Sequence, residues 1–214
     1  LMDDNFGTIV DTIRDGRRIY DNIRKAVGYV FTIHIPIALT SLLAPMLGID
    51  PSSLFLLPLH VVLLELIIDP TCSIVLERQP AEENIMDRPP RDPKEQMLTR
   101  KGLVKSVLQG LAIFAAAFGT YYLTLAGDPA NAPVARAMGL GIIMLSNLML
   151  VMVNCSDRDS AARSFRRLAR DRVMWLVNVG TLLGLAAILY TPLAHVLKLA
   201  PLSGWQALTV VGMA

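Results

Sequence analysis

Long apolar stretches alternate with short polar connectors along this chain. Asp, Glu, Lys and Arg are absent from five of the stretches, 26–49, 106–127, 137–156, 173–197 and 199–214, and a sixth, 51–76, contains only Glu65 and Asp69. About 20 consecutive apolar residues match the hydrocarbon thickness of a bilayer, so each stretch predicts a transmembrane helix. The predicted spans are 26–48, 54–76, 103–126, 135–155, 173–196 and 201–214.

An amphipathic stretch precedes the first span. Ile9, Ile13, Ile19 and Ile23 form an apolar stripe among charged residues, which is typical of a helix exposed to water on one side. No helix breaker separates this stretch from the first span, so one long helix is predicted to run from water into the membrane. The predicted fold class is all-α: a polytopic membrane helical bundle of six transmembrane helices with an N-terminal stalk helix. Its parts are a stalk within 1–25, a helical hairpin at 26–76, a connector at 77–102 and a four-helix domain at 103–214.

Composition and charge support the membrane assignment. The 214 residues are 53% hydrophobic, with a mean hydropathy of +0.49, which argues against a soluble enzyme. Of the 20 Lys and Arg residues, 18 lie in the stretches 14–25, 77–105 and 156–172. Basic connectors stay in the cytoplasm, so the N-terminus is predicted to be cytoplasmic and nucleic acid is not an expected partner. Two cysteines cannot build a disulfide framework. The first residues lack the pattern of a signal peptide and read as the continuation of a longer protein.

Glu65 and Asp69 are the acidic residues within the predicted spans. Their i, i+4 spacing places both carboxylates on one helical face, about one turn apart. Two carboxylates this close repel each other unless a cation or protons neutralise them, and ionisable groups at this depth usually serve a transport pathway. The pattern predicts a cation or proton site. The alternatives are a salt bridge to a neighbouring helix or a protonated side chain, although no Lys or Arg lies at comparable depth.

Other polar residues and prolines extend this candidate site. Pro70 frees a backbone carbonyl one turn earlier, and Thr71 adds a hydroxyl oxygen. In the first span, Pro36 frees a second carbonyl, and His34 is predicted to be a cation ligand, a proton carrier, a positive partner of Glu65 or a packed histidine. Asn147, in the fourth span, either supplies an oxygen to the site or joins helices by hydrogen bonding.

Three segments resemble the P-type cation-transporting ATPases, and their members of the calcium-pump type in particular. Residues 3–10 (Asp-Asp-Asn-Phe-Gly-Thr-Ile-Val) and 16–22 (Gly-Arg-Arg-Ile-Tyr-Asp-Asn) resemble the junction of the phosphorylation domain with the fifth transmembrane helix. Residues 84–91 (Asn-Ile-Met-Asp-Arg-Pro-Pro-Arg) resemble the loop after the sixth helix. The resemblance implies that the chain is helices five to ten, with residues 1–25 as the end of the phosphorylation domain and the stalk.

The resemblance also implies an activity and its partners. The full-length protein would be an ATP-driven pump with an aspartyl-phosphate intermediate, in a bacterial plasma membrane. ATP and Mg²⁺ would be bound by upstream actuator, nucleotide-binding and phosphorylation domains, which with the lipid bilayer and the transported cation would be the partners. This chain would contain no catalytic residue, bind no cofactor besides the transported cation, and be inactive alone.

The resemblance assigns one ligand residue by residue and leaves the cation open. Asp69 matches the cation-binding aspartate of the sixth helix. Calcium pumps have Asn at the place of Glu65 and Glu at the place of Ile37, so one carboxylate has moved from the fifth helix to the sixth. They also have Gly at the place of Pro70 and Asn at the place of His34. Calcium, magnesium, manganese and the proton remain candidates. Two alternatives from other classes are a proton-coupled secondary transporter or channel module that does not use ATP, and a structural membrane subunit.

Overall fold

The computed structural model describes residues 5–91, 96–154 and 171–214, except for the side chains of Asp69, Cys72 and Ser73. The described residues form helices and no strand, so the predicted all-α class is confirmed. The α-helices are α1 (Phe6–Met46), α2 (Pro58–Thr71), α3 (Arg100–Leu125), α4 (Ala132–Asn154), α6 (Arg172–Tyr190), α7 (Leu193–Val196) and α8 (Gly204–Met213). Short 3₁₀ turns at Pro51–Ser53 and Pro129–Asn131 lie before α2 and α4, and a π-helix at Cys72–Leu76 follows α2.

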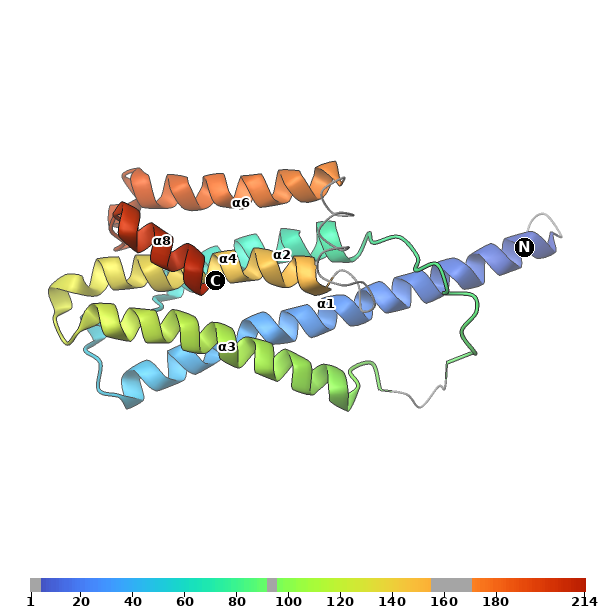
Figure 1. Ribbon diagram of the computed structural model, residues 1–214, viewed down its shortest axis with the longest axis horizontal. Helices are drawn as coiled ribbons and strands as arrows, with labels where there is room; N and C mark the ends of the chain where they lie inside the picture. Colours follow the sequence, from blue (N-terminus) through green and yellow to red (C-terminus); the bar gives the residue numbers. More distant parts are fainter. Residues whose placement is uncertain (1–4, 92–95, 155–170) are drawn as a thin grey trace.

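Helix α1 joins the stalk to the first span without a break, as predicted. It begins after Asn5, whose side-chain oxygen accepts a hydrogen bond from the Gly7 amide at 2.9 Å, and it continues for 41 residues. At 1.5 Å per residue it is about 60 Å long. Its first half projects beyond the other helices, so that the N-terminus lies far from the bundle (Figure 1).

Helix α2 changes type directly after its proline. The helix begins at Pro58, later than the predicted 54, and Pro70 is its penultimate residue. The π-helix Cys72–Leu76 follows at once. Proline has no N–H to continue the i to i−4 ladder, and a wider turn accommodates the interruption without ending the helix. At Leu66, one turn before Pro70, where a free carbonyl was predicted, α2 stays α-helical, and the irregular turn lies after the proline.

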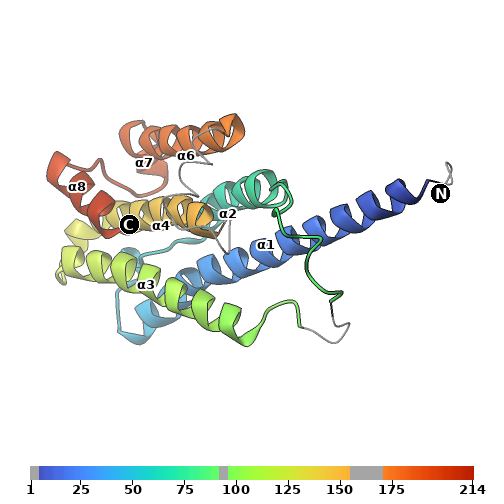
Figure 2. The ribbon, with the colours of Figure 1, turned by 45° about the vertical axis from the view of Figure 1, so that its right-hand side comes forward.

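Helix α4 lies at the centre of the bundle. Of its most apolar 18-residue stretch, 72% is buried, against 28–39% for the other four candidate spans. Helix α3 packs against both α1 and α4 (Figure 2). Glycines allow close approaches to α3 and α4: a Cβ on Gly110 of α3 would lie 2.7 Å from Ile35 Cβ of α1, and one on Gly139 of α4 would lie 2.3 Å from the ring of Phe55, which precedes α2. Small residues at such contacts are a common device in membrane bundles.

Five described helices are long and apolar enough to cross a membrane. The fifth, α6, ends at Tyr190, before the predicted 196, because Pro192 cannot donate the backbone hydrogen bond that would continue the helix. The short helix α7 starts separately after this proline. The predicted sixth span, 201–214, contains α8, whose 10 residues are about 15 Å long and so shorter than a full crossing.

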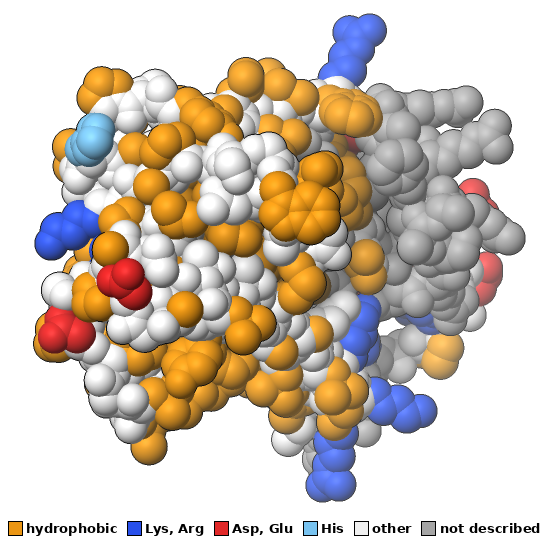
Figure 3. Space-filling view, turned by 60° about the vertical axis from the view of Figure 1, so that its left-hand side comes forward, with side chains coloured by type: hydrophobic (Ala, Val, Ile, Leu, Met, Phe, Trp, Pro, Cys, Tyr) orange, Lys and Arg blue, Asp and Glu red, His pale blue; other side chains and the backbone are white. Residues whose placement is uncertain are grey.

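Charged side chains gather at the two ends of the bundle. One end, here called the basic end, contains the stalk part of α1, the connector after α2 and the start of α3 (Figure 1). On the face seen in Figure 3, hydrophobic side chains and uncharged atoms occupy the middle, and charged side chains lie toward the edges of the view. This distribution fits a molecule whose middle is surrounded by lipid.

The α1–α3 contact predicts a difference between two glycines of α3. Gly110→Ala should destabilise the protein by about 1–3 kcal/mol, because the new methyl group would meet Ile35 and, at 2.8 Å, the Thr32 carbonyl oxygen. Gly119→Ala is the matched control, since nothing lies within 4 Å of a Cβ at that position. Thermal unfolding in detergent measures both, and equal stability of the two variants would contradict this packing.

Candidate functional site

His34 of α1 and Glu65 of α2 meet within the membrane-spanning part of the bundle. The imidazole Nε2 lies 3.1 Å from the Glu65 Oε1, and both side chains are partly exposed, at 46% and 35%. The other ring nitrogen, Nδ1, lies 2.7 Å from the Val30 carbonyl oxygen, one turn earlier in α1. Of the four roles open to His34 in the sequence, its geometry corresponds to the partner of Glu65.

The two contacts of His34 limit where the protons of the pair can lie. A carbonyl oxygen only accepts hydrogen bonds, so Nδ1 donates to Val30. A hydrogen bond between Nε2 and Glu65 then needs one proton, either on an imidazolium facing a carboxylate or on a carboxylic acid facing a neutral ring. The pair has no net charge in either case. A cation that bound Glu65 would therefore have to compete with His34 for the carboxylate.

The neighbourhood of Pro70 is described in part. The backbone of Asp69 lies in α2 one turn after Glu65, while its side chain lies outside the described residues. Thr71 is buried, and its hydroxyl donates to the Ile67 carbonyl at 2.7 Å, within the same helix. The Thr71 oxygen keeps its lone pairs, so the hydroxyl stays available as an acceptor.

Asn147 and Pro36 are engaged elsewhere. Asn147 of α4 is buried and accepts a hydrogen bond from the Tyr29 hydroxyl of α1, which is the helix-joining role. Pro36 leaves α1 continuous, and the Thr32 carbonyl that it frees lies against Gly110 of α3. These two residues therefore connect α1 to α3 and α4 in the structure.

The pair of His34 and Glu65 lies on an open side of the molecule. A hollow of about 510 Å³ runs along α1 beside His34, and its other walls are mostly apolar. Among the side chains that the structure describes, no three His, Cys, Asp or Glu residues come together as metal ligands. The described side chains thus supply one carboxylate, Glu65, and one imidazole, His34, to the candidate site.

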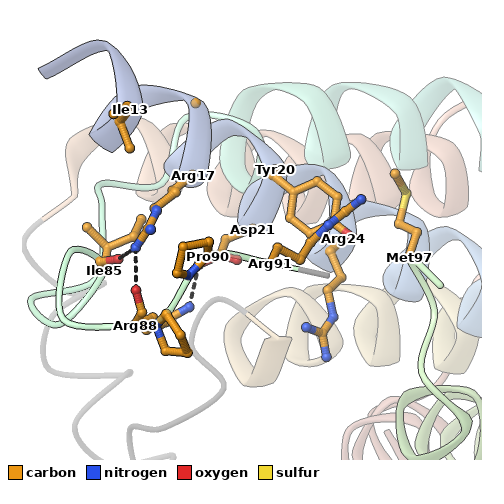
Figure 4. Close-up of a pocket in the computed structure, with 12 residues that line it drawn as sticks. Ile13, Arg17, Tyr20, Asp21, Arg24, Ile85, Arg88, Pro90, Arg91 and Met97 are labelled. Atoms are coloured by element: carbon orange, nitrogen blue, oxygen red, sulfur yellow. Dashed lines mark hydrogen bonds and ion pairs between the residues drawn. The ribbon is translucent and has the colours of Figure 1, made fainter. Parts of the chain in front are cut away.

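Two side chains of the stalk hold the connector that follows α2. Asn22 Nδ2 donates to the carbonyl oxygens of Glu77 and Gln79 at 2.9 and 2.7 Å. Arg17 Nη1 donates to the carbonyl oxygens of Ile85 and Arg88, both at 2.8 Å (Figure 4). The sequence contained a signal for this contact, because both donors lie in the 16–22 motif, but it did not indicate their acceptors.

An ion network reinforces the attachment of the connector. Glu82 pairs with Lys25 at 3.0 Å and with Arg88, and Arg88 also pairs with Asp21 at 2.8 Å. Partial burial of Glu82 acts to raise the pKa of its carboxyl, but the hydrogen bond and charge of Lys25, together with Arg88, outweigh it, so the pKa is lowered. Glu82 is therefore held as a carboxylate between two cations.

Arg136 performs a similar task at the opposite end of the bundle. It is 2% exposed, and its guanidinium donates to the carbonyl oxygens of Leu54, at 2.7 Å, and of Ser52. His60 is fully buried nearby and donates from Nε2 to the Leu197 carbonyl at 2.7 Å. These side chains satisfy carbonyls of connecting segments that would otherwise be buried without partners. Sequence reasoning counted Arg136 as a charge and missed this role.

Comparison with known proteins shows the family of the chain. The family described as "Cation transporting ATPase, C-terminus" matches residues 53–214. The chain belongs to this family. The family resemblance that was predicted from the stalk and connector motifs is thereby confirmed, and the match covers α2, the connector and all later helices.

The proteins that this chain is similar to include transporters named for different cations. The chain is 29% identical, over its whole length, to a calcium-transporting ATPase of Bacillus subtilis (strain 168), and spans 23% of that protein. It is 35% identical over 136 residues to the sodium/potassium-transporting ATPase subunit alpha-1 of Oreochromis mossambicus, covering 59% of this chain and 12% of the relative. The same subunit type of Drosophila melanogaster is 36% identical over 131 residues, with the same coverage. The chain thus spans less than a quarter of these relatives.

The ion network predicts a pH-dependent contribution of Glu82 to stability. Glu82→Gln should cost about 1–3 kcal/mol at neutral pH, because the two cations lose their carboxylate. The folded pKa is lowered, so this contribution is present above the pKa of an unfolded glutamate, about 4.3, and is lost as the pH falls through the folded pKa. Thermal unfolding of both proteins from about pH 7 to about pH 3 should show the difference shrinking below about pH 4.

Glu83→Gln is the control for this measurement. Glu83 is the neighbouring exposed residue, and its substitution should change stability by less than about 0.5 kcal/mol. A Glu82→Gln protein as stable as the Glu83→Gln protein at neutral pH would show that the ion network does not hold the connector.

Proposed function

We propose that the chain is the membrane half of an ATP-driven pump for a hard cation, and that Glu65 and Asp69 are ligands of the transported ion. The contact between His34 and Glu65 carries the proposal, since it pairs two ionisable groups from different spans within an apolar bundle. Such groups are costly in hydrocarbon and usually mark a transport pathway. The π turn after Pro70 adds irregular backbone beside Asp69, which is typical of ion sites in transporters.

The other predicted ligands have secondary roles in this proposal. His34 orients Glu65 and balances its charge in the absence of the ion. Thr71 can still accept through its oxygen, and Asn147 supports α1 through Tyr29. The apolar hollow beside His34 supports a site completed by a helix from an earlier part of the full-length pump. Calcium, magnesium, manganese and the proton stay open as transported ions.

The reaction would take place outside this chain. We propose that upstream actuator, nucleotide-binding and phosphorylation domains bind ATP and Mg²⁺ and form the aspartyl phosphate, as the family resemblance implies. The stalk half of α1 would join the phosphorylation domain to the ion site. The chain would lie in a bacterial plasma membrane, and residues 1–214 alone would hydrolyse no ATP.

The site predicts how charge-neutralising substitutions affect the full-length protein. Glu65→Gln and Asp69→Asn should each weaken cation-dependent phosphorylation by ATP at least about tenfold, because each removes a negative ligand at nearly constant shape. His34→Gln should have a smaller effect, since its nitrogens are used by Val30 and Glu65. A cation titration of the phosphoenzyme, run with calcium, magnesium, manganese, sodium and potassium, measures each variant.

Two controls accompany this titration. Glu83→Gln removes an exposed acidic residue of the connector, away from the hollow beside His34, and should leave the cation dependence unchanged. Residues 1–214 alone should form no phosphoenzyme. An unchanged cation dependence in both carboxylate variants would place the site elsewhere, and cation transport that persists without ATP would favour a secondary transporter.

The orientation of the chain is a separate prediction from the distribution of basic residues. If the basic end is cytoplasmic, single cysteines at Asn131 and Ser203 should react with a membrane-impermeant thiol reagent added from outside. A cysteine at Glu83 should react only after the membrane is opened. Labelling of intact cells and inverted vesicles measures both, and the reverse pattern would contradict the orientation.

A further inference from the structure

A small hollow lies where α1, α3 and α4 meet at the basic end of the bundle. Its volume is about 70 Å³, enough for a few non-hydrogen atoms such as those of a phosphate group. Arg24, Lys25 and Lys105 contribute to its walls, and none of the described residues that line it is acidic. The hollow therefore has the charge and size to hold a small anionic group.

The polar groups of this hollow are mostly donors. Lys105 Nζ donates to the Asn154 Oδ1 at 3.0 Å, and the Asn154 Nδ2 is buried without a hydrogen-bond partner in the described part of the chain. Lys25 is paired with Glu82, whereas the ion pairs found among the described residues include neither Arg24 nor Lys105. Figure 4 shows Arg24 apart from the contacts of Arg17 and Arg88, on the side of Met97. Among the described residues, two cations without an ion-pair partner and one amide donor without an acceptor thus border the hollow.

A second, more open hollow lies on α3 on the other side of Lys105. Its volume is about 570 Å³, and Lys105 lines both. Arg100 and Lys101 lie at its polar end, while Val104 and Leu108, which are 57% and 63% exposed, form its apolar wall. Because α3 is a membrane-spanning helix, this wall faces the hydrocarbon region. The surface changes from cationic to apolar within about two helical turns.

We propose that these neighbouring hollows bind one anionic phospholipid. Its phosphate occupies the small hollow beside Arg24, Lys105 and the Asn154 amide, and an acyl chain lies along Val104 and Leu108. The charge of the walls selects an anionic headgroup, and the apolar, lipid-facing surface next to Lys105 selects a lipid over a soluble phosphate. This proposal depends on the membrane location of α3 and not on the identity of the transported ion.

Native mass spectrometry of the full-length protein in detergent tests the proposal directly. Phosphatidylglycerol and phosphatidylcholine with the same acyl chains are titrated separately onto the wild type and the Arg24→Gln/Lys105→Gln variant. The wild type should retain one phosphatidylglycerol more tightly than phosphatidylcholine, and the variant should lose about fivefold in affinity for each cation removed. Lys105→Arg keeps the charge and should bind as the wild type does.

Lys198→Gln is the matched control, because it removes one exposed positive charge at the opposite end of the bundle. It should leave phosphatidylglycerol binding unchanged. Thermal unfolding confirms that each variant is folded, and Lys105→Gln alone replaces the double variant if that protein does not fold. Equal binding of the two lipids by the wild type, or unchanged binding by the Lys105→Gln protein, would overturn the proposal. Displacement of the lipid by millimolar glycerol phosphate would also overturn it, since it would indicate a site for soluble anions.

Discussion

An ionisable side chain inside an apolar bundle needs a partner, and the structure meets this constraint for Glu65 with His34 at 3.1 Å. The contact joins α1 to α2. His34 is itself held by the Val30 carbonyl one turn earlier in α1, so the imidazole is fixed beside the carboxylate. In the proposed pump, a cation would replace His34 as the partner of Glu65.

Helix α1 connects this site to the polar end of the molecule. Asn22 and Arg17 fasten the connector to the same continuous helix that carries His34, with 17 residues, or about 25 Å, between Arg17 and His34. Glu82 adds a second attachment between Lys25 and Arg88. A displacement of the stalk would therefore move the connector and the His34 side of the site together. In the proposed pump, this continuity would link the ion site to the upstream domains that bind ATP.

Much of the fold could be predicted from the sequence, because lipid imposes a simple rule on apolar length. The five described spans and the unbroken α1 follow from charge-free stretches and from the absence of a breaker. Helix boundaries beside proline were less predictable: Pro36 leaves α1 intact, while Pro70 produces a π turn. The pairing of His34 with Glu65 was one of several alternatives, since only tertiary packing decides which helix faces another. The carbonyl partners of Asn22, Arg17 and Arg136 were missed because backbone acceptors leave no trace in the sequence.

The most direct test of the ion site is a cryo-electron microscopy map of the full-length protein with the transported cation bound, once the titration has identified that ion. The account predicts density for a cation within about 2.0–2.6 Å of a Glu65 carboxylate oxygen, in contact with Asp69, and a longer distance between His34 and Glu65 than in the ion-free protein. A bound cation elsewhere, with the contact between His34 and Glu65 unchanged, would contradict it.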